Sequence, residues 1–292
     1  MDTSFISPQE LAARMGRADA LLLLDVRREN KFPESRYLLA GARRCAPEDV
    51  AAFAASQPSR DVVVYCAYGH DVSADAAATL RAAGRNARAL AGGIEGGEDG
   101  VDSPQDIAQW RAHRPLTMLK RPDWGVGGGS EQASRWITRE RPKIDRIACP
   151  WLIRRFIDAR AEFFYVPTAR VFDEAARLGA VAYDIPGAPV SHEGELCSFD
   201  TLLRAFELSD PALEILARIV RGADTDRLEL APQSAGLLAF SLGLSQLHAT
   251  SDAGMLEAAL PLYDALYAWC RSAQAETHSW KPETMIVKTH TA

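Results

Sequence analysis

Apolar and polar positions follow two different patterns along the chain, and the pattern changes near residue 135. In the first part, short apolar runs over residues 21–27, 61–66 and 90–94 each end in a polar or glycine-rich turn. An alanine-rich, helix-like stretch over residues 72–83 follows the second run. Continuous apolar runs that alternate with helical segments are typical of buried strands in a parallel sheet. We therefore predict an α/β domain over residues 1–112.

In the second part, apolar residues recur mainly at helical spacing, which predicts a mostly α-helical (α+β) domain over residues 136–275. Proline at its first position marks the predicted start of a short amphipathic helix over residues 150–157. Two short strands are also expected, over residues 165–166 and 181–185. Longer helices are predicted from residue 211 onward and over residues 232–247 and 252–272.

Between the two parts, residues 113–135 contain two Arg-Pro pairs and a glycine run that ends at Ser130. Glycine and serine at this density indicate a flexible linker or a mobile loop. The polar segment 276–292 is expected to be either a disordered tail or an arm that docks on the protein.

Composition narrows the classes of function. A chain of 292 residues, 47% of them apolar, is long enough for about two globular domains. A net charge of -6 argues against general nucleic-acid binding. The five cysteines are spread without Cys-x-x-Cys pairs, and no signal peptide or long apolar run is visible. We expect a protein of the reducing cytoplasm without a membrane segment.

Cys66 carries the clearest chemical signal. It ends an apolar run, and a polar loop and a helical stretch follow it. At such a turn, backbone N–H groups and the helix N-terminus favour the thiolate, which is the nucleophilic form of cysteine. The alternative interpretation is a small apolar residue that ends a buried strand.

Three motifs around Cys66 resemble those of a single-domain rhodanese, a sulfurtransferase family whose members carry a cysteine persulfide. They are Leu-Leu-Leu-Leu-Asp-Val-Arg at residues 21–27, Tyr-Cys-Ala-Tyr-Gly-His at 65–70 and Leu-Ala-Gly-Gly-Ile at 90–94. The resemblance implies that Cys66 accepts a sulfane sulfur and passes it to a small-molecule or protein acceptor without a cofactor. Asp25 and Arg27 stand at the end of a buried strand, where a carboxylate and a guanidinium are expected to satisfy neighbouring loops and hold the fold together. The alternative is that they contact the substrate. The backbone amides expected to cradle the persulfide belong to Ala67, Tyr68, Gly69, His70, Asp71 and Val72.

The loop departs from the rhodanese pattern in its charge. Rhodaneses that use thiosulfate typically place an arginine or lysine near the end of this loop. The chain has His70 and Asp71 instead, and no arginine or lysine occurs between Cys66 and Arg81. A dianionic donor would lack its cation and would be repelled by Asp71. We therefore expect weak thiosulfate activity, or a different donor such as a low-molecular-weight or protein persulfide.

The second part resembles the chromate-resistance domain of bacterial chromate operons. The segments that carry the resemblance lie at residues 143–156, 192–199, 219–226 and 262–267. The resemblance implies chromate sensing or resistance, in relatives that often have a DNA-binding N-terminal segment. In this chain a rhodanese-like module takes that place, so direct nucleic-acid binding is not expected.

A cluster of metal-binding residue types lies within this second part. His192, Glu195 and Cys197 are close in sequence and suit Zn²⁺ or Fe²⁺ as ligands. Asp184 precedes them, and carboxylates from the Asp-Thr-Asp turn at residues 224–226 could complete the shell. Ser198 is the predicted N-cap of the helix that follows. The alternative is an ordinary polar loop bonded to backbone and water.

Cys149 indicates a separate hypothesis, because it directly precedes the predicted helix start at Pro150. Its thiol would then meet a helix dipole, and Arg154 and Arg155 could form a site for a tetrahedral oxyanion such as chromate or sulfate. The alternative places both arginines on the solvated face of the helix.

Two classes of function follow. In the first, the protein is a sulfurtransferase that carries a persulfide on Cys66 and is linked to chromate or metal stress. In the second, the helical domain binds metal or chromate as a sensor or resistance protein, and the rhodanese module is a regulatory accessory. An inactive rhodanese fold that serves for docking is a third alternative.

Overall fold

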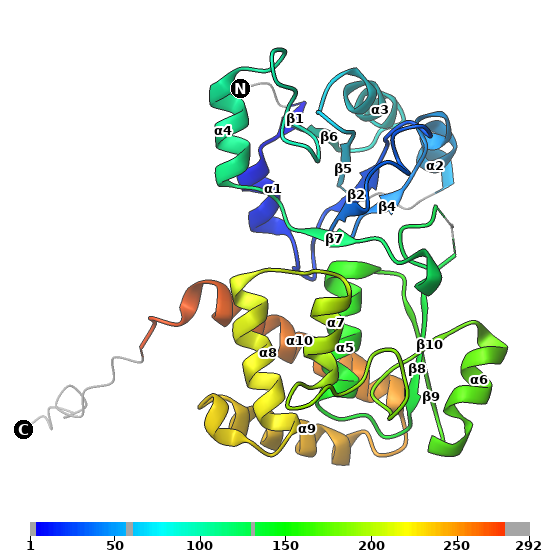
Figure 1. The fold of residues 1–292 in the computed structure, drawn as a ribbon, viewed down its shortest axis with the longest axis vertical. Coiled ribbons are helices and arrows are strands. Elements are labelled where there is room, and N and C mark those ends of the chain that lie inside the picture. The colour runs from blue at the N-terminus through cyan, green and yellow to red at the C-terminus, as the bar shows by residue number, and fades with distance from the viewer. Residues whose placement is uncertain (1–3, 57–60, 130–131, 278–292) are drawn as a thin grey trace, which may run out of the picture.

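The computed structural model describes residues 4–56, 61–129 and 132–277, which form two domains stacked one above the other (Figure 1). The first domain is built on a five-stranded sheet of order β1-β6-β5-β2-β4, in which every neighbouring pair is parallel. Its strands are β1 (Phe5–Ile6), β2 (Leu22–Asp25), β4 (Arg43–Arg44), β5 (Val62–Tyr65) and β6 (Ala87–Leu90). The predicted parallel sheet is therefore confirmed.

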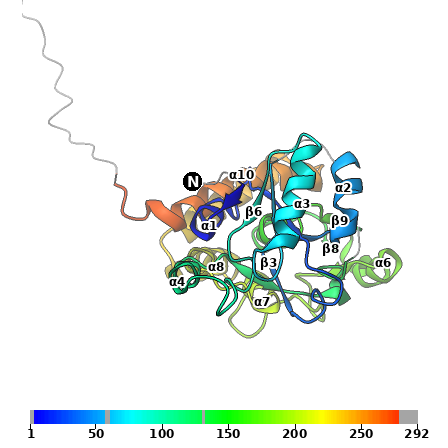
Figure 2. The ribbon, with the colours of Figure 1, turned by 90° about the horizontal axis from the view of Figure 1, so that it is seen from above.

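Helices cover both faces of this sheet. They are α1 (Pro8–Arg14), α2 (Val50–Ser56), α3 (Asp71–Ala82) and α4 (Pro104–Ala112), with a 3₁₀ turn at Pro47–Asp49. Viewed from above, α2 and α3 lie side by side, away from α1 (Figure 2). Leu24, Val62 and Val64 pack against α2 and α3, whereas Leu23 and Val63 point to the opposite face with Leu11 of α1. This alternation follows from the two-residue period of a strand.

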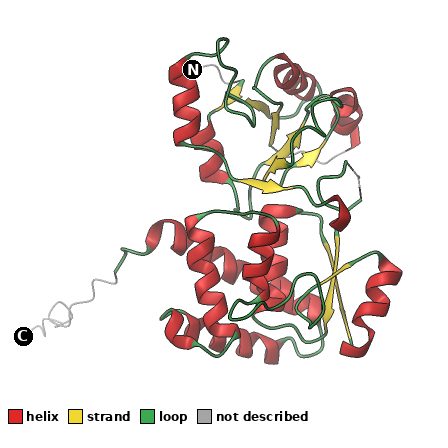
Figure 3. Cartoon of the chain, in the orientation of Figure 1, coloured by secondary structure: helices red, strands yellow, loops and turns green. Residues whose placement is uncertain are grey.

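The second domain combines a small parallel sheet with a helical bundle (Figure 3). The sheet has the order β10-β8-β9, with β8 (Arg135–Arg139) between β9 (Glu162–Val166) and β10 (Val181–Ala182). Helix α6 (Val171–Leu178), which follows a 3₁₀ turn at Thr168–Arg170, packs on β8. The bundle comprises α5 (Asp145–Leu152), α7 (Ser198–Ala205), α8 (Pro211–Asp224), α9 (Ser234–Leu247) and α10 (Asp252–Ala268), with a 3₁₀ turn at Leu228–Leu230 and a π-helical end at Trp269–Ala273. The mainly helical character of this domain is as expected.

The predicted helix start at Pro150 is wrong, because α5 begins at Asp145 and continues into a π-helical segment at Ile153–Ile157. A proline inside a helix leaves the carbonyl four residues earlier without its N–H partner. That carbonyl belongs to Arg146, and the hydroxyl of Tyr183 donates to it at 3.3 Å. A contact from a different element thus satisfies the group that Pro150 leaves open.

The glycine- and proline-rich segment between the domains is not the free tether that its composition indicates. β7 (Thr117–Leu119) pairs antiparallel with β3 (Tyr37–Leu39), and a 3₁₀ turn follows at Pro122–Trp124. Met118 is fully buried, and Trp124 packs against Trp136 and Phe206. Apolar side chains therefore hold residues 117–124 in place, within a segment whose glycine content predicts mobility.

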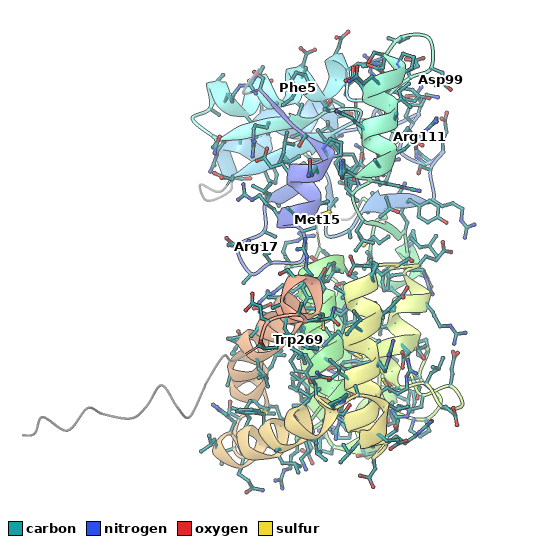
Figure 4. All side chains as sticks on the ribbon, turned by 90° about the vertical axis from the view of Figure 1, so that its left-hand side faces the viewer. Phe5, Met15, Arg17, Asp99, Arg111 and Trp269 are labelled. Atoms are coloured by element: carbon teal, nitrogen blue, oxygen red, sulfur yellow. The ribbon has the colours of Figure 1, made fainter. Side chains whose placement is uncertain are left out.

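The two domains share one apolar core and a set of polar contacts. Leu11 and Leu38 of the first domain belong to the same buried cluster as Trp151 and Phe156 of the second. The Arg271 guanidinium donates to the carbonyl oxygens of Ala12, Ala13 and Met15 at 3.2 to 3.3 Å, at the end of α1. In Figure 4, Met15 lies at the lower end of the first domain and Trp269 lies in the second domain below it. The expected tail over residues 276–292 lies almost entirely outside the described residues.

Candidate functional site

The first candidate site is built around Cys66, which directly follows β5 and precedes α3. The residue is 7% exposed, so its sulfur is held in the loop and not on an open surface. The Gly69 N–H donates to Cys66 Sγ at 3.3 Å. The sulfur therefore receives a backbone donor from the predicted loop, next to the N-terminus of α3.

Close backbone packing fixes the shape of this loop. The Ile94 and Glu95 N–H groups donate to the carbonyl oxygens of Cys66 and Ala67, at 3.1 and 2.9 Å. A Cβ atom at Gly69 would lie 2.6 Å from the Gly92 nitrogen, and Gly69 has a φ of +82°. Only glycine combines that backbone conformation with so close an approach. The glycine motif after β6 thus serves as the support on which the cysteine loop rests.

A side chain also contacts the sulfur. Ser73, a buried residue in the first turn of α3, places its hydroxyl oxygen 3.3 Å from Cys66 Sγ. The same hydroxyl donates to the His70 carbonyl at 3.0 Å. Sequence reasoning did not single out Ser73, because a serine inside an alanine-rich helix gives no signal of its own.

Asp25 and Arg27 form a buried ion pair next to the sheet. The Arg27 Nη2 lies 2.5 Å from Asp25 Oδ2 and 2.9 Å from the Tyr37 carbonyl oxygen. Both side chains are almost completely buried. This arrangement ties the end of β2 to β3, which suits the supporting role predicted for the two residues.

The surroundings of the loop are acidic. His70 Nε2 lies 2.8 Å from Asp102 Oδ2, and its Nδ1 lies 3.8 Å from Glu98 Oε2. The backbone N–H of Glu98 and the His70 side chain both bond Asp102 and hold its pKa below the usual value. A pocket of about 360 Å³ beside Tyr68 is lined by Glu95, Glu98 and Asp99, with Arg111 as the basic residue of the same lining. Asp99 and Arg111 are visible at the top of the molecule (Figure 4).

In the second candidate site, three carboxylates lie around one imidazole ring. His192 Nε2 lies 3.1 Å from Asp224 Oδ2, 3.4 Å from Asp184 Oδ1 and 3.7 Å from Asp145 Oδ2. Donor atoms of Asp145, Asp184 and His192 all lie within 4.8 Å of one another. Asp145 is fully buried, whereas the His192 side chain is 42% exposed. The carboxylate oxygen atoms therefore lie below the surface, and the imidazole ring lies nearer to the solvent.

Different elements position these ligands. Asp145 opens α5 and accepts from the Ser198 and Phe199 N–H groups at the start of α7, at 2.5 and 3.1 Å. Asp224 ends α8, and Asp184 follows β10. Asp184 has a φ of +50° and Ile144, just before Asp145, has a φ of +27°. Non-glycine residues in this region are strained, and such strain concentrates at functional sites.

The electrostatics of the cluster favour a cation. Burial and the neighbouring carboxylates raise the pKa of Asp145 and of Asp224. The hydrogen bond to Asp184 is the main reason that the pKa of His192 rises to about 9. For Asp184, burial favours the neutral acid, but hydrogen bonds from His192 and Ser198 and the charges of Arg139 and Arg146 lower its pKa.

Only His192 of the three predicted metal ligands lies in this cluster. Glu195 is 83% exposed and pairs with Arg227 at 3.2 Å. Cys197 is buried, and its thiol donates to Asp200 Oδ2 at 3.3 Å. Cys197, not Ser198, is the N-cap of α7. The cap turns the thiol toward Asp200, and burial strongly raises its pKa.

The structure removes the reason for including Cys149 in an oxyanion site, because its thiol does not lie at a helix start. Cys149 lies inside α5 and not at a helix start, and burial raises the pKa of its thiol well above the usual value. Arg154 donates to Glu257 at 2.5 Å, and Arg155 binds Asp264 through two bonds of 2.7 and 2.8 Å. The two arginines are therefore held by α10 and do not face Cys149 from a shared helix N-terminus.

Each of the two domains matches the model of a known protein family. Residues 7–99 match the family model of the rhodanese-like domain, and residues 136–270 match that of the ChrB C-terminal domain. The chain thus joins a rhodanese-like domain to a ChrB C-terminal domain. Both resemblances predicted from the sequence are confirmed.

A curated relative, Protein ChrB of Cupriavidus metallidurans, is 34% identical over 137 residues. The aligned region is 47% of this chain and 40% of that protein, so the chain spans less than half of its relative. Among solved structures, a rhodanese homologue of Thermus thermophilus is 29% identical and covers 31% of this chain and 95% of its own, with a TM-score of 0.26. A rhodanese-like domain from Anabaena sp. is 30% identical and covers 34% and 100%, also with a TM-score of 0.26.

None of the helices in the described part of the chain has the length and apolarity that a membrane span requires.

Proposed function

We propose that the protein is a sulfurtransferase that carries a persulfide on Cys66, linked to chromate or metal stress through its second domain. The observation that supports this most directly is the pair of polar groups at Cys66 Sγ beside the N-terminus of α3: the Gly69 N–H, which donates to the sulfur, and the Ser73 hydroxyl, which lies 3.3 Å from it and can turn to donate to a thiolate. Donors that converge on a sulfur stabilise a thiolate, and they would equally stabilise the terminal sulfur of a persulfide.

The proposed reaction has two redox-neutral steps. The Cys66 thiolate attacks the outer sulfur of a donor persulfide, a new S–S bond forms, and the donor leaves as its thiolate. An acceptor thiolate then attacks the outer sulfur of the Cys66 persulfide, and Cys66 leaves as a thiolate again. No cofactor takes part in either step.

The charges around the loop favour a persulfide donor over thiosulfate. Arg81, the first arginine after Cys66, donates to the Ala87 carbonyl at 2.9 Å and so has a structural contact of its own. Asp71, Glu98 and Asp99 would repel a dianion near the loop. A thiol-derived persulfide carries less negative charge at its reacting end and meets less repulsion.

Sulfur transfer tests this proposal directly. Wild type and Cys66→Ser are compared with glutathione persulfide and with thiosulfate as donors and a thiol as acceptor. We expect turnover with the persulfide, much less with thiosulfate, and none in the variant. Cys45→Ser is the matched control, because it removes a buried cysteine elsewhere in the same domain. Equal turnover in Cys66→Ser and wild type would contradict the proposal.

A second candidate function is metal binding in the ChrB C-terminal domain, with the rhodanese module as an accessory to a sensor. The supporting observation is the convergence of three largely buried carboxylates on His192 Nε2. Three oxygen ligands and one imidazole suit Mn²⁺, Fe²⁺ or Zn²⁺, and an ion would relieve the repulsion among the carboxylates. Asp145, Asp184, Asp224 and His192 would hold the ion, without the thiolate ligand that sequence proximity suggested.

Titration of metal-free protein with Mn²⁺ and Zn²⁺ tests this second function. We expect one ion to bind per chain, and His192→Ala and Asp224→Asn to lose it. Glu195→Gln is the control, since that side chain lies outside the cluster. If neither ion binds the folded wild type, or if the Glu195 variant loses binding equally, the metal hypothesis is wrong.

A further inference from the structure

Six arginines line a pocket at the junction of the two domains. Its volume is about 380 Å³, and it lies between the end of α1, the start of β2 and the π-helical end of α5. Its basic lining residues come from both domains: Arg14, Arg17, Arg43, Arg154, Arg155 and Arg160. Arg17 is visible at the lower edge of the first domain, facing the second (Figure 4).

Carboxylates outside the pocket hold several of these arginines in place. Asp19, Glu257, Asp264 and Asp158 pair with Arg17, Arg154, Arg155 and Arg160. No carboxylate belongs to the pocket lining within the described residues. The charged groups that line the cavity are therefore cationic. Six guanidinium groups against four carboxylates leave a net positive charge, which favours an anion.

The paired arginines retain donors for a ligand. Arg155 uses Nε and Nη2 for Asp264, and Arg17 uses the same two atoms for Asp19. In each case Nη1, which carries two of the five guanidinium N–H groups, makes neither of these bonds. The carboxylates therefore restrict the rotamers of both side chains, which lowers the entropy that an anion must overcome on binding.

The remaining wall of the pocket is apolar. Leu11, Met15, Leu21 and Leu23 contribute to it, and all four are at most 8% exposed. At Gly16, whose φ is +72°, a Cβ atom would lie 2.2 Å from Phe156 Cζ, so the tight contact between the domains at this wall requires glycine. A bare inorganic anion would leave this apolar wall without a partner.

We propose that this pocket binds a small phosphate ester, with the phosphate dianion on the arginines and an apolar group against the leucine and methionine side chains. Guanidinium groups pair with phosphate through planar, two-point contacts, and a pocket of this volume suits a small organic molecule. Because both domains supply arginines, the ligand would also hold the two domains together. This site is independent of the proposed chemistry at Cys66.

Isothermal titration of the full chain with phenyl phosphate and with inorganic phosphate tests the proposal. A pH of about 8 keeps the ester a dianion, since its second pKa is about 6. We expect phenyl phosphate to bind one per chain, at least tenfold more tightly than inorganic phosphate. Binding of neither anion overturns the proposal. Equal affinity for the two would identify a site for bare oxyanions and overturn the assignment to an ester.

Arginine variants test whether phenyl phosphate binds in this pocket. Arg14→Gln should weaken phenyl phosphate at least tenfold, and Arg17→Gln provides a second, exposed position that removes a charge from the same pocket. Arg218→Gln, at an exposed position on α8 outside the pocket lining, is the matched control and should bind like the wild type. Thermal unfolding confirms that each variant is folded. Equal weakening in all three variants would show that the effect is one of net charge and would contradict the site.

Discussion

The Cys66 sulfur lies 3.3 Å from the Ser73 hydroxyl oxygen, and that hydroxyl donates its single proton to the His70 carbonyl. While Cys66 is a thiol, the S–H can donate to Ser73. When Cys66 becomes a thiolate, the hydroxyl can turn from His70 to the sulfur. The Ser73 hydroxyl can thus accept a hydrogen bond from the Cys66 thiol and donate one to the Cys66 thiolate.

Replacing Ser73 with alanine should slow the alkylation of Cys66 by iodoacetamide roughly tenfold at neutral pH. A hydrogen bond to a charged group contributes about 1.5 kcal/mol, and its loss disfavours the thiolate. Thr79→Ala is the control, because that hydroxyl on the same helix donates to the Asp75 carbonyl instead. A wild-type alkylation rate in a folded Ser73 variant would show that the contact does not affect the thiolate.

Reversing the charge of Asp71 should improve thiosulfate as a donor. Asp71→Arg replaces a repulsive group at the start of α3 with a cation, and a difference of two charges near the loop predicts about a tenfold gain in kcat/KM for thiosulfate. The same substitution at Asp75, an exposed position one turn further along α3, should give a smaller gain. No gain at Asp71 would mean that charge at the loop does not determine the donor.

The stability of the metal-free protein should fall as the pH rises from about 6.5 to about 9. The folded-state pKa of His192 is raised to about 9, so its charge stabilises the fold below the unfolded value of 6.5, and this contribution is lost as the pH passes 9. The raised pKa of Asp145 and of Asp224 acts in the same direction, because their ionisation adds repulsion.

Urea unfolding at several pH values in the presence of a chelator measures this effect. His192→Asn should lower the free energy of unfolding at pH 7 and flatten its dependence on pH. A pH profile in the variant that matches the wild type would show that His192 does not balance the carboxylates.

Removing the Arg271 guanidinium should destabilise the junction of the domains. Arg271→Ala leaves three carbonyl oxygens at the end of α1 without this donor, and we expect a loss of about 1 to 2 kcal/mol in the free energy of unfolding. Arg218→Ala, at an exposed position of α8, is expected to change stability by much less. Equal stability of the two variants would contradict a structural role for the Arg271 contacts.

Sequence patterns within short segments were enough to predict the first domain, but they did not give the full set of residues in the cluster around His192. The strands that end at Asp25 and Tyr65 follow from continuous apolar runs, and Cys66 from its place after such a run. Asp184 and Asp224, which the sequence offered as further ligands, do lie beside His192, but so does Asp145, which the sequence did not indicate as a ligand. Spacing along the chain cannot show which carboxylates converge in space.

Position in the sequence also led to wrong predictions for Cys197 and Pro150. Cys197 is five residues from His192, but the capping turn of α7 directs its thiol to Asp200. Pro150 looks like a helix start, yet the Tyr183 hydroxyl satisfies the carbonyl that the proline leaves free. In both cases a contact from outside the local segment decided the outcome.

The most direct test of sulfur transfer through Cys66 is the mass of the protein after it reacts with a persulfide donor and is freed of excess reagent. We predict one added sulfur atom, located on the peptide that contains Cys66, and its release when an acceptor thiol is added. An unchanged mass at Cys66, or a sulfur atom that the acceptor thiol cannot remove, would contradict sulfur transfer through this residue.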